Sequence, residues 1–146
     1  MEITSSYDSL SHTKWNCKYH VVFVPKCRRK VLYGKIMHFL RSKFHELAVQ
    51  KGCKIEGGNI MKDHVHMLIS IPPKYNVSSI VGYLKGKSAI AIARQFGGKE
   101  RNFNGETFWA KGFFVTTVGH DADVVKNYIK NQEQLDKYMS NEETQF

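Results

Sequence analysis

The chain lacks the features that define several common protein classes. Its 146 residues contain no apolar run long enough to cross a membrane, and the polar first residues do not have the pattern of a signal peptide. It has only three cysteines, Cys17, Cys27 and Cys53, and no Cys-x-x-Cys pair. We therefore expect free thiols and a reducing, cytoplasmic location.

Acidic residues are also scarce. The chain has 13 Asp and Glu against 22 Lys and Arg, which gives a formal net charge of +9. An excess of this size suits a polyanion such as nucleic acid, and no basic amphipathic helix of the membrane-surface type stands out. The hydrophobic fraction of 42% predicts one folded domain over residues 1–146, with a polar arm at 1–13 and a polar tail at 138–146.

Hydrophobic periodicity predicts alternating strands and helices along the chain. Strands are expected at 14–26, 53–61, 64–71 and 108–118, and helices at 35–50, 77–96 and 121–137. The short link between the second and third strands indicates an antiparallel hairpin. This order predicts an α+β, ferredoxin-like (RRM-like) antiparallel sheet with two helices on one face, the other face open, and an additional C-terminal helix.

The most informative motif is the pair His64 and His66. Residues two apart on a strand point to the same side, whereas Val65, Met67 and Ile69 point to the opposite, apolar side. Two neighbouring imidazoles form half of a possible site for a divalent metal, with the adjacent Asp63 as a possible orienting group. The simpler alternative is a pair of surface histidines.

A second pair lies in the predicted last helix. Tyr128 and Gln132 are four residues apart and share one helical face. Tyr128 could be an ordinary core aromatic residue, but an amide on the same stripe needs polar partners when it is buried. A tyrosine beside a metal-binding amide would suit nucleophilic catalysis.

Two other segments resemble known functional motifs but do not have the spacing that those motifs require. The segment Gly82–Ser88 resembles a phosphate-binding loop but is one residue short and lies within a predicted helix. The segment Lys111–Val115 resembles an RNA-recognition strand but lacks the glycine between its aromatic residues. Phe113 and Phe114 should therefore lie on opposite faces and cannot stack bases together.

Basic and aromatic residues suggest a surface for nucleic acid. The predicted phosphate-contacting side chains are Lys26, Arg28, Arg29, Lys30, Lys85, Lys87 and Lys111. Possible stacking residues for unpaired bases are Tyr19, Tyr33, Tyr83 and Trp109, although each residue of this kind is more often part of the core.

Together these motifs resemble those of the single-tyrosine HUH transposases (TnpA type, insertion sequence 200/605 family). The resemblance extends from about Thr13 to Lys137. It is carried by five segments: Trp15–Phe23, His64-Val65-His66, Tyr83–Ser88, Phe108-Trp109 and Tyr128–Gln132.

The resemblance implies a nuclease and strand transferase that acts on single-stranded DNA, recognises hairpins at element ends and needs no nucleotide cofactor. By position, Tyr128 would be the nucleophile that forms a 5′-phosphotyrosine. His64, His66 and Gln132 would bind Mg²⁺ or Mn²⁺. It also implies a homodimer whose active sites are shared between subunits.

Three alternatives remain open at this point. The chain could be a domesticated tyrosine transposase associated with repetitive extragenic palindromes. It could be a non-catalytic, RRM-like nucleic-acid-binding protein. It could also hold zinc through His64, His66 and Cys53.

Overall fold

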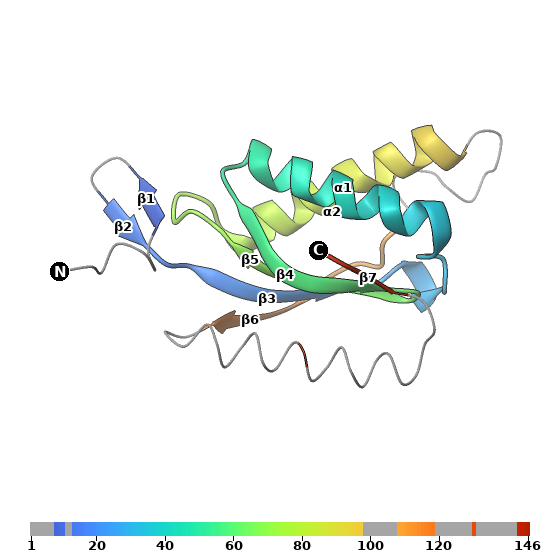
Figure 1. Ribbon diagram of the computed structural model, residues 1–146, viewed down its shortest axis with the longest axis horizontal. Helices are drawn as coiled ribbons and strands as arrows, with labels where there is room; N and C mark the ends of the chain where they lie inside the picture. Colours follow the sequence, from blue (N-terminus) through green and yellow to red (C-terminus); the bar gives the residue numbers. More distant parts are fainter. Residues whose placement is uncertain (1–7, 11–12, 98–107, 119–129, 131–142) are drawn as a thin grey trace.

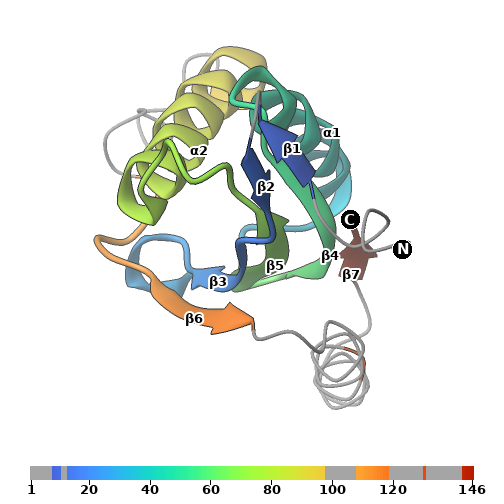
Figure 2. The same ribbon diagram turned by 90° about the vertical axis from the view of Figure 1, so that its left-hand side faces the viewer.

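The computed structural model describes residues 8–10, 13–97, 108–118, 130 and 143–146. Its central feature is a five-stranded antiparallel sheet in the order β6-β3-β5-β4-β7. These strands are β3 (Lys18–Phe23), β4 (Lys54–Met61), β5 (His64–Ser70), β6 (Phe114–Val118) and β7 (Glu143–Gln145). Helices α1 (Gly34–Gln50) and α2 (Val77–Ile92) lie together on one face (Figures 1 and 2).

Alternation along the central strand gives the sheet two different faces. In β5, Val65, Met67 and Ile69 belong to the hydrophobic core, whereas His66 between them points to the other side. The register pairs Val21 with Met67 and Phe23 with Val65, so β3 contributes to the same core. The predicted antiparallel sheet with helices on one face is confirmed.

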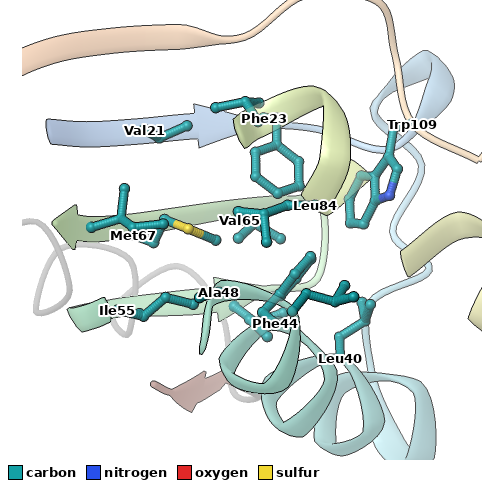
Figure 3. Packing of buried hydrophobic residues seen from close by; sticks show 14 of the residues in the cluster. Val21, Phe23, Leu40, Phe44, Ala48, Ile55, Val65, Met67, Leu84 and Trp109 are labelled. Atoms are coloured by element: carbon teal, nitrogen blue, oxygen red, sulfur yellow. The ribbon is translucent and has the colours of Figure 1, made fainter. Parts of the chain in front are cut away.

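The core lies between the sheet and the two helices (Figure 3). Phe44 of α1 and Leu84 of α2 are almost fully buried there. The Trp109 ring stands edge-on to Phe23, with 4.8 Å between the ring centroids. Aromatic edge-to-face packing of this kind adds stability beyond the apolar area that it buries.

The segment that leads to β6 is fastened to the rest of the domain. Lys26 donates its backbone N–H to the Phe108 carbonyl at 2.8 Å, and Trp109 donates its indole N–H to Ser88 at 3.0 Å. The Lys85 ammonium on α2 donates to the carbonyl oxygens of Ala110 and Gly112 at 2.7 and 2.8 Å. These bonds fix the start of the edge strand against α2.

Three features differ from the sequence prediction. The strand expected over 108–118 begins only at Phe114. Before it, Phe108, Trp109 and Phe113 pack in or against the core, and the backbone of Phe108 and Ala110 bonds to the segment that follows β3. Part of the expected polar arm forms a hairpin of β1 (Asp8–Leu10) and β2 (Thr13–Trp15). The end of the expected tail adds β7 to the sheet, where Phe146 packs against Phe44 at 5.9 Å.

The two shorter helical segments and the remaining predicted helix complete the description. A 3-10 turn, η2 (Lys26–Arg28), follows β3, and a π-type turn, η3 (Ala93–Gly97), extends α2. Of the helix predicted over 121–137, only Lys130 is among the described residues. Within the described part of the chain, no helix is long and apolar enough to cross a membrane.

The pair Gly57 and Gly58 gives a test of the close packing between β4 and β5. A Cβ atom on Gly58, which has φ +119°, would clash with the His66 carbonyl and lie 2.5 Å from Met67 Cα, whereas one on Gly57 would meet nothing within 4 Å. We expect Gly58→Ala to lower the free energy of unfolding by about 2–4 kcal/mol. The matched variant Gly57→Ala should cost less than about 1 kcal/mol. Equal effects in denaturant titrations would contradict this description of the β4–β5 contact.

Candidate active site

The predicted histidine pair lies on the face of the sheet opposite the helices. His66 is opposite Val22 of β3 and Asn59 of β4, and His64 is opposite Met61. Leu68, the next residue of β5 on this face, is opposite His20 of β3. Directly paired side chains share a face, so three imidazoles gather on one surface.

The rings of these histidines are in contact distance. His64 and His66 stack with their centroids 5.5 Å apart and an interplanar angle of 22°. His20 meets His66 edge-on at 5.9 Å. His20 was not among the residues predicted from sequence, and the only signal for it was its alternation with the core residues Val21 and Phe23.

Asp63 holds the His64 ring in place. The Asp63 carboxylate bonds to His64 Nδ1 at 2.7 Å through Oδ1 and accepts a bond from Arg28 Nε at 3.1 Å through Oδ2. Because Nδ1 faces the carboxylate, Nε2 is the ring nitrogen that is suited to a metal ion. A carboxylate on the distal nitrogen is the usual orienting group for a metal-binding histidine, so the local chemistry fits a divalent ion.

The charge state of Asp63 is set by opposing effects. Partial burial would raise the pKa of its carboxyl group, but the hydrogen bond and charge of His64, together with the charge of Arg28, outweigh it. The net result is a pKa below the ordinary value, so Asp63 is ionised near neutral pH. A negative carboxylate is the form that can accept bonds from both neighbours.

His66 is deeply buried and stays uncharged. Its exposed fraction is 2%, and burial, followed by the nearby charges of His64 and His20, lowers its pKa to about 3. Burial also lowers the pKa of His20. A neutral imidazole has the lone pair that metal binding requires, so no proton has to be displaced from His66 at neutral pH.

The histidine face is less open than predicted. Besides His66, the side chains of Leu68 and Asn59 are fully buried, and His20 is only 8% exposed. The neighbouring rings cover one another in part, which the sequence could not show. Further along this face, Glu56 accepts bonds from Lys18 at 3.1 Å and Ser70 at 2.8 Å.

The alternative zinc set is wrong for this fold. Cys53 lies in the hydrophobic core on the helix side of the sheet, whereas His64 and His66 are on the other side. Burial raises the pKa of the Cys53 thiol to about 11, which disfavours the thiolate that zinc needs. Among the described residues, no group of three or more His, Cys, Asp or Glu side chains could hold a metal ion.

The structure describes two of the four residues that were predicted for catalysis and metal binding. The structure brings His64 and His66 together, but Tyr128 and Gln132 lie outside the described residues. The roles of these two residues therefore rest on the sequence.

The predicted basic residues are in different environments. Lys26, Arg28, Arg29 and Lys30 lie on an exposed turn after β3, and Lys87 and Lys111 are also exposed. Lys85 is half-buried, and its two bonds to backbone carbonyls give it a structural role. Its part in DNA binding stays a prediction.

The aromatic residues also separate into core and surface. Trp109, Tyr19 and Tyr83 pack in or against the core, and only Tyr33 of the four suggested stacking residues is exposed, at 54%. Phe113 packs against the core while Phe114 is 59% exposed, which confirms that they point to opposite faces. Phe114 pairs with Val22, so it extends the row of His66 to the sheet edge.

Comparison with known proteins identifies the class. The sequence model of the family "Transposase IS200 like" matches residues 13–132. The chain is 44% identical over 129 residues to the transposase for insertion sequence element IS200 of Salmonella typhimurium, covering 88% of this chain and 85% of the relative. It is 27% identical over 119 residues to the ISDra2 transposase TnpA of Deinococcus radiodurans, covering 81% and 85%.

Solved structures agree with this assignment. A crystal structure named as a candidate transposase of Deinococcus radiodurans R1 superimposes with a TM-score of 0.68 and 26% identity, covering 86% of this chain and 97% of the other. A tyrosine transposase bound to a REP hairpin has the same fold, with a TM-score of 0.59 at 13% identity, covering 84% and 67%.

The fold and the sequence relationships thus define a transposase. The chain belongs to the IS200-like transposase family, whose members cleave and rejoin DNA during the transposition of insertion sequences.

The low pKa of His66 predicts how stability depends on pH when no metal is bound. Below about pH 6.5 the unfolded chain binds a proton at this histidine, whereas the folded protein does so only near pH 3. The unfolded state therefore binds more protons in this window, and lowering the pH should reduce the free energy of unfolding by up to about 1.4 kcal/mol per unit.

Denaturant titrations in chelator at several pH values between 7 and 4 measure this slope. The variant His66→Gln should be less pH-dependent than the wild type over that range. The control His38→Gln, at an exposed position of α1, should keep the wild-type slope. An unchanged slope in His66→Gln would contradict the buried neutral state.

Proposed function

We propose that the chain is a metal-dependent HUH endonuclease and strand transferase that acts on single-stranded DNA through a covalent tyrosine intermediate. The observation that carries the proposal is the stacked pair of His64 and His66, oriented by Asp63, in a member of a transposase family. The basic turn after β3 adds the positive charge that a DNA substrate needs.

The metal site would consist of His64, His66 and Gln132. All three are neutral ligands, so they leave the positive charge of the ion undiminished toward the phosphate. Mg²⁺ or Mn²⁺, when bound, would act as a Lewis acid on the scissile phosphodiester, and two imidazoles favour Mn²⁺. The residues that are described fit this group, because His66 is neutral and the Asp63 contact leaves His64 Nε2 as its ligand atom.

Tyr128 would be the nucleophile. Its phenolic oxygen forms a bond to phosphorus while the bond from phosphorus to the 3′-oxygen breaks, which leaves a 5′-phosphotyrosine and a 3′-hydroxyl. The phenol gives up one proton and the leaving 3′-oxygen gains one, so the step needs no oxidant or nucleotide. A later 3′-hydroxyl can reverse the same exchange and join new DNA ends, because the covalent link keeps the energy of the phosphodiester.

The substrate would be single-stranded DNA with hairpins near the element ends. The neighbour of the same fold that is bound to a REP hairpin supports this expectation. The 44% identity to an insertion-sequence transposase favours a mobile-element enzyme over a domesticated relative. The exposed Phe114, in line with His66, offers a surface on which an unpaired base can stack.

The working form would be a homodimer with active sites shared between subunits. In the described sheet, β6 has β3 as its only neighbour, and Phe114 and Val115 on it are 59% and 37% exposed. An edge strand with exposed apolar side chains can pair with a second copy.

The covalent intermediate gives the decisive test of the chemistry. Wild-type protein mixed with a hairpin-bearing, 5′-labelled or 3′-labelled single-stranded oligonucleotide and Mn²⁺ should form a protein–DNA adduct that survives denaturing electrophoresis and carries only the 3′-side fragment. Tyr128→Phe should abolish the adduct, and Tyr138→Phe, a tyrosine in the same C-terminal segment, should retain it. An adduct that persists in Tyr128→Phe would exclude Tyr128 as the nucleophile, and no adduct at all would favour a non-catalytic binding protein.

The metal ligands can be tested without DNA. Titration of Mn²⁺ followed by electron paramagnetic resonance should show affinity reduced by about tenfold or more in His64→Ala and Gln132→Ala. The matched variants Cys53→Ala and Gln134→Ala should bind as the wild type does. Loss of Mn²⁺ binding in Gln134→Ala but not in Gln132→Ala would change the assigned ligand.

A further inference from the structure

We propose that Arg28, held by Asp63, is a specific DNA-phosphate-binding residue beside the histidine pair, and that Asp63 couples phosphate binding to the orientation of His64. This inference rests on the proposed function for the identity of the ligand. It goes further because it separates one arginine from the other basic residues of the turn and gives a carboxylate a role in DNA binding.

The first observation is that one carboxylate serves two partners. Asp63 uses Oδ1 for His64 Nδ1 and Oδ2 for Arg28 Nε, at 2.7 and 3.1 Å. An arginine that is bound through Nε still has four N–H donors on its two Nη nitrogens. The Arg28 side chain is 67% exposed, so these donors are accessible. A planar guanidinium fixed at one edge is well suited to bind a phosphate with the other edge.

The second observation is the backbone that places Arg28 there. Cys27 and Arg28 have φ values of 60° and 49°, in the left-handed region that residues other than glycine rarely adopt. Such a conformation costs about 1–2 kcal/mol per residue and persists only when the surroundings enforce it. Here Arg28 donates its backbone N–H to the Pro25 carbonyl at 2.8 Å, which closes the turn.

The third observation is that the segment just after this turn is hydrogen-bonded to the turn that carries Asp63. Leu32, which is fully buried, donates its backbone N–H to the Lys62 carbonyl at 3.0 Å. Arg29 and Lys30 are in the same exposed turn, but within the described part of the chain it is Arg28 that binds the Asp63 carboxylate. The basic turn and the histidine pair therefore form one continuous site.

An isolated surface ion pair contributes little to stability, so its stabilising value does not explain the arrangement. Its consequence for binding is more specific. Because one carboxylate binds both Arg28 and His64, a DNA phosphate on the Nη edge of Arg28 would lie beside the histidine pair, and the next phosphate of the strand would approach the imidazoles. The Arg28–Asp63 ion pair would thus align the DNA strand before any phosphodiester bond is broken.

A double-mutant cycle between Arg28 and Asp63 tests the proposal through DNA affinity alone. Binding of a fluorescent hairpin-bearing single strand is measured by anisotropy in EDTA, at one fixed salt concentration, so neither metal nor cleavage contributes. We expect Arg28→Ala to weaken binding about tenfold and Asp63→Ala to weaken it about threefold. The second effect is informative in its sign, because removing a negative charge should by itself strengthen binding to DNA.

Asp63→Ala should no longer weaken DNA binding once Arg28 has been replaced. In the Arg28→Ala background, Asp63→Ala should strengthen binding or leave it unchanged, since no arginine remains to be held. Arg28→Lys keeps the charge but not the two-edged geometry, so it should bind with intermediate affinity. In the Arg28→Lys background, too, Asp63→Ala should not weaken DNA binding.

Arg29→Ala is the matched control for loss of charge. It should weaken DNA binding by its charge alone, about two- to threefold, and combine additively with Asp63→Ala.

The proposal is overturned if Asp63→Ala strengthens DNA binding in the wild-type background, or if the Arg28–Asp63 cycle is as additive as the Arg29–Asp63 cycle. Adduct formation by Tyr128 is measured separately. If no adduct forms but the Arg28 and Asp63 substitutions are non-additive as expected, only the proposed nuclease activity is overturned. If the adduct forms but the two substitutions are additive, only the proposed role of Arg28 is overturned.

Discussion

The alternation of side chains along β5 is the constraint on which the rest of this structure depends. Val65, Met67 and Ile69 enter the core beneath the helices, and the same backbone then has to turn His64 and His66 to the opposite face. A shift of one residue in register would exchange the two sets and bury the imidazoles among apolar side chains. The free energy of burying the core therefore also fixes the position of the site.

The neighbouring strands strengthen this constraint. Pairing of β3 with β5 places His20 beside the histidine pair, and pairing of β4 with β5 brings the close contact at Gly58. The turn between β4 and β5 then presents Asp63, which is bonded to His64 and to Arg28 of a distant turn. Backbone bonds between the strands and side-chain bonds at Asp63 together position these pieces.

The electrostatics of this face follow from the same packing. Burial keeps His66 neutral, and Asp63 stays ionised because His64 and Arg28 outweigh the cost of its partial burial. A neutral imidazole, an ionised carboxylate and an exposed cation thus lie within one small region. This combination suits the proposed phosphodiester substrate, because neutral imidazoles would leave the positive charge of a bound metal ion undiminished toward the phosphate.

The sequence by itself determined the alternation in β5, the two helices of the core, the histidine pair and the basic turn, because these depend on local periodicity and residue type. It also predicted that Phe113 and Phe114 face opposite ways, for the same reason. Only the tertiary structure decided that Cys53 lies on the far side from the histidines, that Lys85 binds carbonyl groups, and that His20, Arg28 and β7 join the site or the sheet. These facts depend on contacts between residues far apart in the chain, which the spacing of residues in a sequence does not specify.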